Sequence, residues 1–392
     1  MVECHPLKIF CGIMNKVIVI EAQRLFRPKK HGMEIVALEI LKQLKNTASN
    51  EMQYHVVVKQ DEDKCLTNSR NFTVTQLPAK PYPIWEQILL PSFIKKLNPA
   101  LLHCCSNTAP LFCKKPMVVT IHDVIYMQAG GFKGSAYQNF GNLYRRWIVP
   151  KAAKKAKAII TVSEFAKKEI VAALNITPNK VHVIYNGLNA IYRPCTDIKK
   201  SAAFRTEYKL PEKYLLHFGN TAARKNTSGV LKAYIQYCFE KENALPLVIS
   251  GCSKATITAI AQKENLLLPQ NNIIYTGYME AAALPLLYSN AFLFLYPSLA
   301  EGFGLPLVES MACGTPVITA HNSSLPEVAG DAALFVDAAN PNEIFLAINR
   351  LLTDANLYNQ LIEKGLKNAA RFSWEKTANQ TIEIYKMVLN NL

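Results

Sequence analysis

The stretch EGFGLPLVESMACGTPV, residues 301–317, decides the fold. It follows the apolar run AFLFLYPS, residues 291–298, which predicts a buried strand. Leu305–Cys313 predicts a short helix, because Pro306 suits the first turn of a helix and Gly314 suits its C-terminal end. The stretch therefore predicts a strand, a tight turn and a helix, the unit from which parallel α/β sheets are built.

Two carboxylates and two glycines lie in or near this turn. Gly302 and Gly304 allow positive φ angles and a close approach of a ligand to backbone N–H groups. Free N–H groups at a helix start favour anionic ligands, and the Glu301 and Glu309 carboxylates can accept hydrogen bonds from sugar hydroxyls. The alternative is a purely structural turn with an acidic first helical turn, and the residues alone leave both interpretations open.

The same alternation of strands and helices runs through the whole chain. Predicted strands cover residues 16–21, 54–60, 116–123, 158–163, 180–187, 214–220, 244–251, 272–278, 291–298, 315–320 and 332–337. Predicted helices cover residues 32–44 and 163–174, the second with Ser163 as its N-cap. The pattern breaks in the polar segment 192–213 and then restarts. We therefore expect α/β units at residues 1–192 and 208–371, a linker at 193–207 and a final helix at 372–392.

Charge is distributed unevenly along the 392 residues. The net charge is +15, yet residues 1–200 carry 29 Lys and Arg against 13 Asp and Glu, a net +16. Such asymmetry favours an anionic partner for the first half, with nucleic acid, a membrane surface and a phosphorylated substrate as the candidates. No nucleic-acid-binding motif accompanies the charge, so we expect no nucleic acid partner.

The basic stretch LYRRWIVPKAAKKAKA, residues 143–158, accounts for part of this charge. Its cations surround Trp147, a combination that suits an anionic bilayer surface. An ordinary solvated helix face explains the pattern equally well. Elsewhere in the first half, Arg27, Lys29 and Lys30 suggest an anionic acceptor, again with a solvated loop as the alternative.

Several kinds of site are not supported by the sequence. The ten cysteines include no CxxC pair, which favours reduced thiols in a cytoplasmic protein and argues against zinc. No GxGxxG follows the first strand and no P-loop is present, so nicotinamide and P-loop chemistry are not expected. No apolar run reaches the roughly 20 residues of a membrane span. Residues 1–13 are expected to be an extension upstream of Met14.

The stretch 301–317 resembles the signature of glycosyltransferase family 4, a family of retaining, nucleotide-sugar-dependent enzymes with the GT-B fold. The two-glutamate motif of the family, with seven residues between, matches Glu301 and Glu309. Similar segments occur in order along most of the chain: PIWEQILLP (83–91), TIHDVIY (120–126), ITVSEFAKKEI (160–170), VIYNGLN (183–189), LLHFGNTAARKNTSGVLKAY (215–234), SSLPEVAGDAALFVD (323–337) and RFSWEKTANQTIEIY (371–385). The chain looks closest to the mannosyltransferase-like branch.

This resemblance implies roles for particular residues. Glu309 would bind the nucleotide ribose, and Glu301 would bind hydroxyl groups of the donor sugar. Arg224 and Lys225 would neutralise the diphosphate, which also follows from the charge that a departing nucleoside diphosphate gains. The implied donor site is completed by backbone N–H groups of Gly302, Phe303, Gly304 and Leu305 at the sugar and phosphate, and by Tyr278 beside the base.

Three residues of the first half belong to the same implied site. His122 would lie close to the donor sugar, although a single histidine is more often structural. Asp123 beside it and Gly32 would lie on the acceptor side. Gly32 is the single glycine in FRPKKHGMEIV, where the family often has a glycine-rich turn, so this stretch departs from the family pattern.

The resemblance implies two Rossmann-like domains with parallel sheets that face a central cleft, and a C-terminal helix that crosses back to the N-terminal domain. It implies transfer of a hexose, with mannose as the candidate, from a GDP- or UDP-sugar to an envelope polysaccharide or lipid-linked glycan. No metal or other cofactor is expected, and the enzyme would lie in the cytoplasm, with peripheral membrane contact as an open question. A nucleotide-sugar epimerase and a non-catalytic anion-binding scaffold remain alternatives.

A local prediction concerns SSLPEVAG, in which Ser324 and Glu327 have the spacing of a capping box. We expect these two side chains to close the first turn of one helix. Their role would then be structural, even though the segment follows the signature stretch.

Overall fold

The computed structural model describes residues 16–47, 51–127 and 136–392, so the upstream stretch 1–13 lies outside the described residues. The chain forms two compact units. The first comprises Met1–Thr120, Leu143–Ile159 and Ile382–Leu392, and the second comprises Ile121–Asn142 and Ile160–Thr381.

A seven-stranded sheet is formed by the first half of the chain, in the order β3-β2-β1-β4-β5-β6-β7. Its strands are β1 (Lys16–Glu21), β2 (Met52–Lys59), β3 (Phe72–Leu77), β4 (Leu101–Cys104), β5 (Met117–Thr120), β6 (Ala158–Thr161) and β7 (Val181–Val183). The pairings of β1 with β2 and β4, of β2 with β3 and of β4 with β5 are parallel, which agrees with the parallel sheet predicted for this half. Strands β3 and β4 were not predicted, because β3 is a half-exposed edge strand and β4 has only four residues.

The helices of this half are α1 (Gly32–Asn46), α2 (Tyr82–Ile84), the π-helix η1 (Trp85–Leu89), α3 (Leu90–Leu97), α4 (Ala136–Lys155) and α5 (Glu164–Leu174), with 3₁₀ turns η2 (Ile125–Met127) and η3 (Pro178–Lys180). The Ser163 hydroxyl accepts a hydrogen bond from the Ala166 amide, which confirms Ser163 as the N-cap of α5. The predicted helix at 32–44 is confirmed and is two residues longer.

A six-stranded sheet lies in the second unit, in the order β10-β9-β8-β11-β12-β13. Its strands are β8 (Leu215–Phe218), β9 (Leu247–Ser250), β10 (Ile273–Gly277), β11 (Leu293–Tyr296), β12 (Val317–Ala320) and β13 (Leu334–Val336), all joined by parallel pairings. Both faces are buried: Leu293 and Leu295 of β11 belong to one hydrophobic cluster, Phe294 and Tyr296 to the other. This explains the continuous apolar strands of the sequence.

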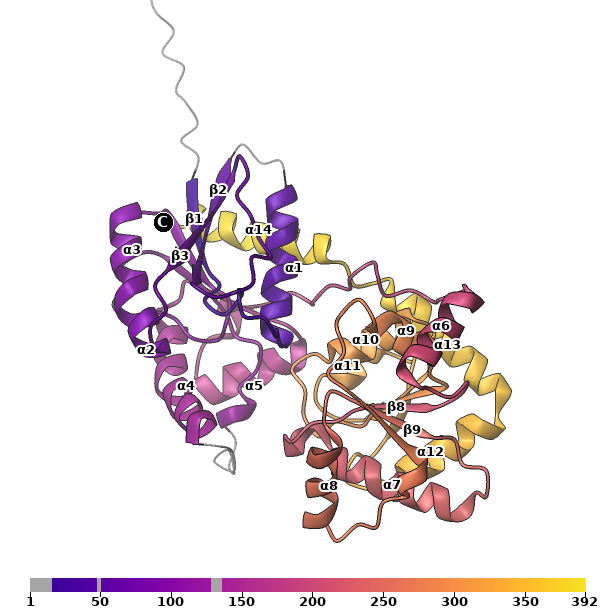
Figure 1. Ribbon diagram of the computed structural model, residues 1–392. Helices are drawn as coiled ribbons and strands as arrows, with labels where there is room; N and C mark the ends of the chain where they lie inside the picture. Colours follow the sequence, from indigo (N-terminus) through magenta and orange to yellow (C-terminus); the bar gives the residue numbers. More distant parts are fainter. Residues whose placement is uncertain (1–15, 48–50, 128–135) are drawn as a thin grey trace, which may run out of the picture. The chain divides into compact units, whose positions relative to one another are not determined.

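Helices cover both faces of this sheet (Figure 1). They are α7 (Thr227–Glu240), α8 (Lys254–Lys263) and α12 (Pro341–Thr353) on one side, and α9 (Leu284–Ser289), α10 (Leu305–Ala312), α11 (Leu325–Ala329) and α13 (Ala355–Ala369) on the other. Two 3₁₀ turns, η4 (Ala223–Lys225) and η5 (Gln270–Asn272), lie in loops. Helix α6 (Ile198–Tyr208) occupies most of the segment 193–207 that the sequence indicated as a linker.

The C-terminal helix α14 (Trp374–Asn390) ends in the first unit. Buried Tyr385 shares a hydrogen bond of 2.6 Å with Nδ1 of His103 in β4, and the other nitrogen of His103 lies 2.8 Å from the hydroxyl of Thr120 in β5. This chain of buried polar groups confirms that the final helix packs on the N-terminal sheet.

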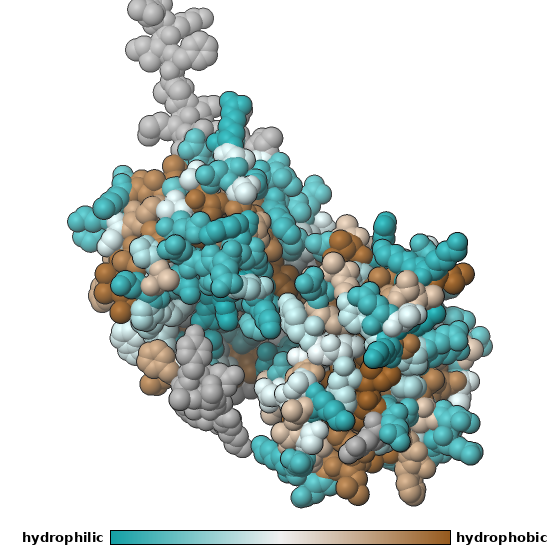
Figure 2. Space-filling model, in the orientation of Figure 1, coloured by the Kyte–Doolittle hydropathy of each residue, from teal (hydrophilic) through white to brown (hydrophobic). Residues whose placement is uncertain are grey.

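Hydrophilic side chains cover much of the face shown in Figure 2, with separate hydrophobic patches between them. Among the described helices, none is both long and apolar enough to cross a bilayer. The two hydrophobic clusters of the second unit instead lie on the two faces of its sheet.

Candidate functional site

Two loops meet at the carboxyl edge of the six-stranded sheet. One follows β8 and contains η4, and the other follows β11 and leads into α10. Strands β8 and β11 are neighbours, and the strand order reverses between them. In open parallel sheets this reversal leaves a crevice in which ligands bind.

The Glu301 carboxylate joins the two loops. Its Oε1 accepts hydrogen bonds from Lys225 Nζ at 2.6 Å and from the Tyr296 hydroxyl at 2.8 Å, and its Oε2 accepts one from Arg224 at 3.0 Å. Glu301 is only 5% exposed. The sequence predicted all three charged residues for one site, and the structure brings them into direct contact.

Charge and burial compete in this cluster. Burial alone would raise the pKa of Glu301, but Lys225 and Arg224 outweigh it and hold the pKa below its usual value. Burial lowers the pKa of Lys225 despite the attraction of Glu301. For Arg224 burial opposes the charged form, yet Glu301 and then Asp123 raise the pKa. The carboxylate is therefore ionised at neutral pH and balances cations that have lost part of their hydration.

Side chains of the loop after β12 hold the backbone of Glu301. The Ser323 hydroxyl accepts a hydrogen bond from the Glu301 amide at 3.1 Å, and the Ser324 hydroxyl donates to the Glu301 carbonyl at 3.0 Å. Ser323 has a φ of 53°, in the left-handed region that non-glycine residues seldom adopt. Strain of this kind is concentrated at functional sites.

The capping box predicted for Ser324 and Glu327 is wrong. Ser324 is bonded to Glu301 and does not cap α11 through its side chain. Glu327 accepts hydrogen bonds from the amides of Glu164 and Phe165, at 2.7 and 3.0 Å, and so satisfies free N–H groups of α5. Sequence spacing suggested a local contact, whereas both groups found partners far away in the chain.

The two glycines of the turn serve different purposes. Gly304 uses the positive φ that glycine allows, with a φ of 95°, and stands directly before α10. The φ of Gly302 is not positive, but a Cβ atom there would lie 2.6 Å from the His122 carbonyl oxygen. Gly302 therefore allows the loop to approach the backbone of His122. His122 itself is buried at 7% exposure.

A pocket of about 230 Å³ opens beside Glu301 within the second unit. Its lining residues are Asp123, Val124, Ile125, Phe165, Ala166, Glu169, Leu299, Ala300, Glu301, Gly302, Asn322 and Ser323. Asp123 therefore lies at the same pocket as Glu301, and its Oδ1 also accepts a hydrogen bond from the Ile125 amide at 3.2 Å. Glu309 does not line this pocket.

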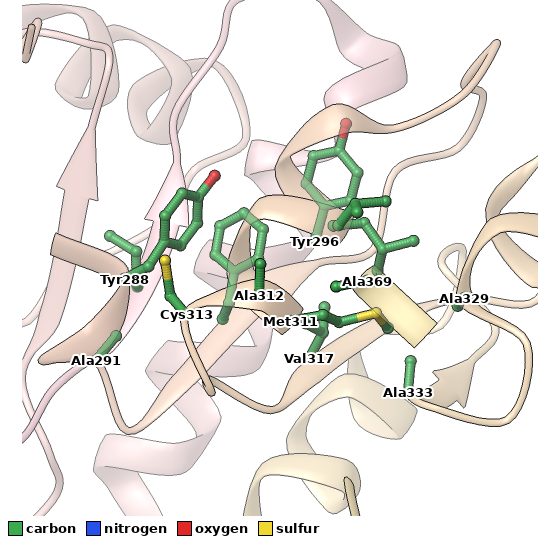
Figure 3. Close-up of a cluster of buried hydrophobic side chains, with 14 of the residues drawn as sticks. Tyr288, Ala291, Tyr296, Met311, Ala312, Cys313, Val317, Ala329, Ala333 and Ala369 are labelled. Carbon is green, nitrogen blue, oxygen red and sulfur yellow. The ribbon is translucent and has the colours of Figure 1, made fainter. Parts of the chain in front are cut away.

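Glu309 lies one turn into α10 and has different surroundings. The Tyr288 hydroxyl donates to its Oε2 at 3.0 Å, and the side chain is half-buried. Burial raises the pKa of Glu309 to about 7. Figure 3 shows that the hydroxyl groups of Tyr288 and Tyr296 point to the same side of the hydrophobic cluster that holds their rings. Tyr296 therefore positions Glu301, whereas Tyr288 and Tyr192 together position Glu309.

The other predicted residues are scattered more widely. Phe303 is buried, with its ring centre 5.5 Å from that of Phe372 and 6.2 Å from that of Tyr185, so only its backbone could meet a ligand. Leu305 begins α10, and Tyr278, 57% exposed, directly follows β10.

Gly32 begins α1 in the first unit. Its φ is not positive, and a Cβ atom there would meet nothing within 4 Å. In the preceding loop, Arg27 lies 3.6 Å from the Glu34 carboxylate, and Lys30 pairs with Asp63. These two cations are therefore engaged within the first unit.

Three contributors to the cluster were missed from sequence. Tyr296 is the last residue of a buried strand, Ser323 is a plain loop serine, and Asn226 follows the basic pair. The side-chain amide of Asn226 donates hydrogen bonds to the backbone carbonyls of Pro297 and Ala338, at 3.0 and 2.7 Å. The bond to Pro297 connects the basic loop to the loop after β11. A polar residue at the end of an apolar strand was a usable signal for Tyr296.

Residue types that bind metals do not cluster in the described part of the chain. No group of three His, Cys, Asp or Glu side chains in that part of the chain could hold an ion. The thiols of Cys104 and Cys105 are buried, which raises the pKa of each. These thiols are therefore poor metal ligands and poor nucleophiles.

Two family models match the chain, one in each half. Residues 31–190 match the family model described as Glycosyltransferase Family 4, and residues 199–368 match the model described as Glycosyl transferases group 1. The second match contains both loops of the Glu301 cluster.

Several curated relatives are mannosyltransferases. The chain is 34% identical over 245 residues to O-antigen chain mannosyltransferase B of Escherichia coli, which covers 62% of this chain and 64% of the relative. It is 28% identical over 253 residues to the serotype-specific mannosyltransferase WbdA of Escherichia coli, and this match covers 63% of this chain and 31% of WbdA. The match thus spans less than two thirds of both relatives. O-antigen chain mannosyltransferase RfbU of Salmonella typhimurium is 27% identical over 262 residues, and this match covers 67% of this chain and 66% of RfbU.

Solved structures share the arrangement of elements along nearly the whole chain. The crystal structure of Anabaena Alr3699/HepE in complex with UDP and glucose aligns with a TM-score of 0.73 at 18% identity, covering 95% of this chain and 99% of that one. The crystal structure of WaaG, a glycosyltransferase involved in lipopolysaccharide biosynthesis, aligns with a TM-score of 0.71 at 15% identity. This alignment covers 94% of this chain and 99% of WaaG. The predicted pair of Rossmann-like, parallel-sheet domains of the GT-B fold is confirmed.

Proposed function

The chain belongs to glycosyltransferase family 4, and we propose that it transfers a hexose from a nucleotide-diphosphate sugar to a hydroxyl group of a glycan acceptor, with retention of anomeric configuration. The observation that carries this proposal is the ionised, buried Glu301 held between Arg224 and Lys225 beside a pocket. Such a cluster contains both groups that a nucleotide sugar needs: cations for its diphosphate and a carboxylate for its sugar hydroxyls.

Arg224 and Lys225 would act on the leaving group. The bond between the anomeric carbon and the diphosphate oxygen breaks, and the electron pair leaves with the nucleoside diphosphate. The acceptor oxygen then bonds to the anomeric carbon on the same face, and its proton passes to an oxygen of the departing diphosphate. Fixed cations in a partly buried site stabilise the charge that develops on this diphosphate.

Glu301 would accept hydrogen bonds from the donor sugar rather than exchange protons. Its lowered pKa keeps it ionised, so it is a poor general acid. A retaining glycosidase would instead need a carboxylate pair about 5–5.5 Å apart across the glycosidic bond. Glu301 lines the pocket and Glu309 does not, which supports separate binding roles for the two glutamates.

Glu309 would bind the ribose of the donor, with Tyr278 beside the base. The half-buried Glu309 carboxylate accepts hydrogen bonds from Tyr288 and Tyr192, and its two oxygens keep capacity to accept a ribose hydroxyl as well. His122 would lie beside the sugar, because its backbone faces Gly302. GDP-mannose is the proposed donor and an envelope polysaccharide or lipid-linked glycan the proposed acceptor, on the strength of the mannosyltransferase relatives.

A panel of GDP- and UDP-sugars tests this proposal. We expect one donor to raise the melting temperature of the purified chain, since ligand binding stabilises the folded state. With mannose-containing oligosaccharides present, the same donor should yield a product with a new glycosidic bond. Isomerised donor without a new bond would instead indicate an epimerase. Failure of every nucleotide sugar to bind would indicate an anion-binding scaffold.

We also place the enzyme in the cytoplasm, with peripheral contact to an anionic membrane through residues 143–158. Trp147 on α4 is 55% exposed, Lys151 Nζ lies 3.5 Å from its ring centre, and neighbouring Leu143 is 58% exposed. Each basic side chain near an anionic bilayer contributes about 1 kcal/mol to binding. Vesicles with phosphatidylglycerol should bind the chain, and Trp147→Ala should weaken this binding. Equal binding to neutral vesicles would contradict the proposal.

A further inference from the structure

A second polar cluster lies at the carboxyl edge of the seven-stranded sheet, within the first unit. Strand order reverses between β1 and β4, and Glu21, the last residue of β1, pairs in register with Cys104 of β4. Glu21 therefore stands where a sheet of this order binds ligands. The segment PIWEQILLP, residues 83–91, supplies a second buried carboxylate, Glu86, for which the family resemblance offered no role.

Glu86 lies on the π-helix η1, a rare local structure that is frequent at functional sites. Its Oε1 accepts hydrogen bonds from the hydroxyl of Tyr82 at 3.0 Å and from that of Thr108. Its Oε2 accepts hydrogen bonds from the hydroxyl of Tyr144 and from Gln87 Nε2 at 2.8 Å. Both oxygens of this buried carboxylate are therefore satisfied by neutral donors.

Glu21 is equally buried but incompletely bonded. Its Oε1 accepts a hydrogen bond from the Gln23 amide at 2.8 Å, whereas its buried Oε2 has no hydrogen-bond partner among the described residues. The side-chain oxygen of Gln23 lacks a partner in the same way. Glu21 is 2% exposed and Gln23 4% exposed. Buried acceptors without donors are rare in folded proteins, so both oxygens have capacity to accept a hydrogen bond from a ligand.

Electrostatic effects show that Glu21 and Glu86 belong to one cluster. After burial, Glu86 and then Glu21 contribute to raising the pKa of Tyr82, and both glutamates also raise that of Tyr144. Arg24 lies 4.9 Å from the Tyr82 ring centre. Within the described residues neither glutamate forms an ion pair, unlike Glu301 in the second unit.

We propose that this cluster is an acceptor subsite, in which Glu21 and Gln23 accept hydrogen bonds from hydroxyl groups of a neutral sugar. Tyr82 and Tyr144, both half-buried, meet edge to face with ring centres 5.5 Å apart. Arg24 lies over the Tyr82 ring, so the exposed part of the Tyr144 ring is the aromatic surface left for the apolar face of the sugar. The inference rests on the proposed function, because it names acceptor-binding side chains of the same transferase.

The chemistry of the cluster selects against other small ligands. Above about pH 7 Glu21 is ionised, and its charge then repels phosphate and other anions, because neither glutamate has an ion-paired cation among the described residues. Sugar hydroxyls provide the donors that the two unpartnered oxygens lack. Neutral sugar units of a glycan are therefore the ligands that fit.

The test measures binding of methyl glycosides of mannose, glucose, galactose and rhamnose to the full chain, by calorimetry or ligand-observed NMR. We expect at least one glycoside to bind at pH 8, where Glu21 is ionised because its pKa is about 7, and Glu21→Gln to weaken this binding about tenfold or more, the loss that follows when a hydrogen bond to a charged group is weakened. Tyr144→Phe should weaken it by a smaller factor. Glu39→Gln, the same change at a buried glutamate of α1 that pairs with Lys42, is the matched control and should bind normally.

GDP and UDP binding, measured on the same samples, separates this inference from the proposed function. A chain that binds glycosides through Glu21 but no nucleotide would retain the subsite and overturn the proposed function. The subsite is overturned if no glycoside binds to the wild-type chain. It is also overturned if both Glu21→Gln and Tyr144→Phe bind glycosides as tightly as the wild type. If Glu21→Gln does not fold, glycoside binding by Tyr144→Phe decides whether the subsite exists. This variant is expected to fold, because it removes only one hydroxyl group from a half-buried side chain.

Discussion

Each sheet has a buried glutamate near the edge where its strand order reverses, and the two glutamates have opposite surroundings. In the second unit, Glu301 contacts Arg224 and Lys225, and its pKa is lowered. In the first unit, Glu21 faces a second carboxylate, Glu86, and burial followed by Glu86 raises its pKa to about 7. The same topological position therefore carries an ion-paired carboxylate in one unit and an incompletely bonded one in the other.

The difference indicates which ligand each edge can bind. Cations that are already partly desolvated would suit a charged diphosphate in the proposed function, and Glu301 would hold them in place before the ligand binds. Carboxylates surrounded by hydroxyl and amide donors suit a neutral ligand with hydroxyl groups of its own. The basic surplus of the first half of the chain therefore does not describe its strand edge, which is acidic at Glu21 and Glu86.

Removal of a cation from the Glu301 cluster should have the largest effect on activity. Lys225→Met keeps most of the side-chain stem but leaves Glu301 with Arg224 alone. We expect kcat to fall about 10²- to 10³-fold, the usual cost of losing one group that stabilises developing charge. Steady-state kinetics with the donor identified in the panel would measure this.

Lys232→Met is the control for this change, because Lys232 pairs with Glu264 on the surface of the same unit. It should leave kcat within about twofold, since exposed ion pairs contribute little. Similar losses of activity in both variants would show that positive charge acts at long range rather than at the cluster.

Opposite pH dependence of stability should distinguish the two glutamates. The pKa of Glu21 in the folded chain, about 7, exceeds the ordinary value of 4.5, so wild-type stability is lost as pH rises from 4.5 through 7. Besides Glu86, the groups that act on Glu21 are Arg24 and the amides of Gln23 and Cys105. Glu21→Gln should therefore gain stability relative to wild type over this range, by at most about 3 kcal/mol. Thermal unfolding at several pH values would measure the gain.

Glu301→Gln should show the reverse behaviour. The lowered pKa of Glu301 means that its stabilisation is present above pH 4.5 and is lost as pH falls through the lowered value. The variant should therefore be less stable than wild type at neutral pH and approach it in acid. Parallel pH profiles for the two variants would remove the proposed distinction between the clusters.

The sequence predicted most of the fold because its strands are short and apolar and its helices follow them in strict alternation. The edge strand β3, with exposed Thr and Gln side chains, carried too weak a pattern. The charged residues of the Glu301 cluster were predicted together from the family resemblance of their two segments, and the structure explains why they meet, because their loops follow neighbouring strands. Ser323 and Glu327 were not assigned their observed partners, since their hydrogen bonds join segments distant in sequence. Glu21 was missed because a single acidic residue at a strand end has no distinctive spacing.

A methyl group added to the signature turn should have a smaller but local effect. In Gly302→Ala the Cβ would lie 2.6 Å from the His122 carbonyl oxygen, so the loop that carries Glu301 must shift. We expect a loss of about 1–3 kcal/mol in stability, typical of overpacking, together with weaker nucleotide binding. Differential scanning calorimetry and a GDP titration would measure both. Unchanged nucleotide affinity would show that the position of this loop does not matter for the donor.

The corresponding glycine-to-alanine change at the start of α1 should have the smallest effect on stability, and this effect should be stabilising. A Cβ at Gly32 would meet no atom within 4 Å, and its φ is not positive, so Gly32→Ala introduces no strain. Alanine also reduces the entropy of the unfolded chain, so stability should rise by about 0.4–1 kcal/mol. If the flexibility of this glycine were needed for the acceptor, the acceptor KM would rise while the stability still increased. A normal acceptor KM in the stabilised variant would remove Gly32 from the acceptor side and leave Glu21 as the candidate of the first unit.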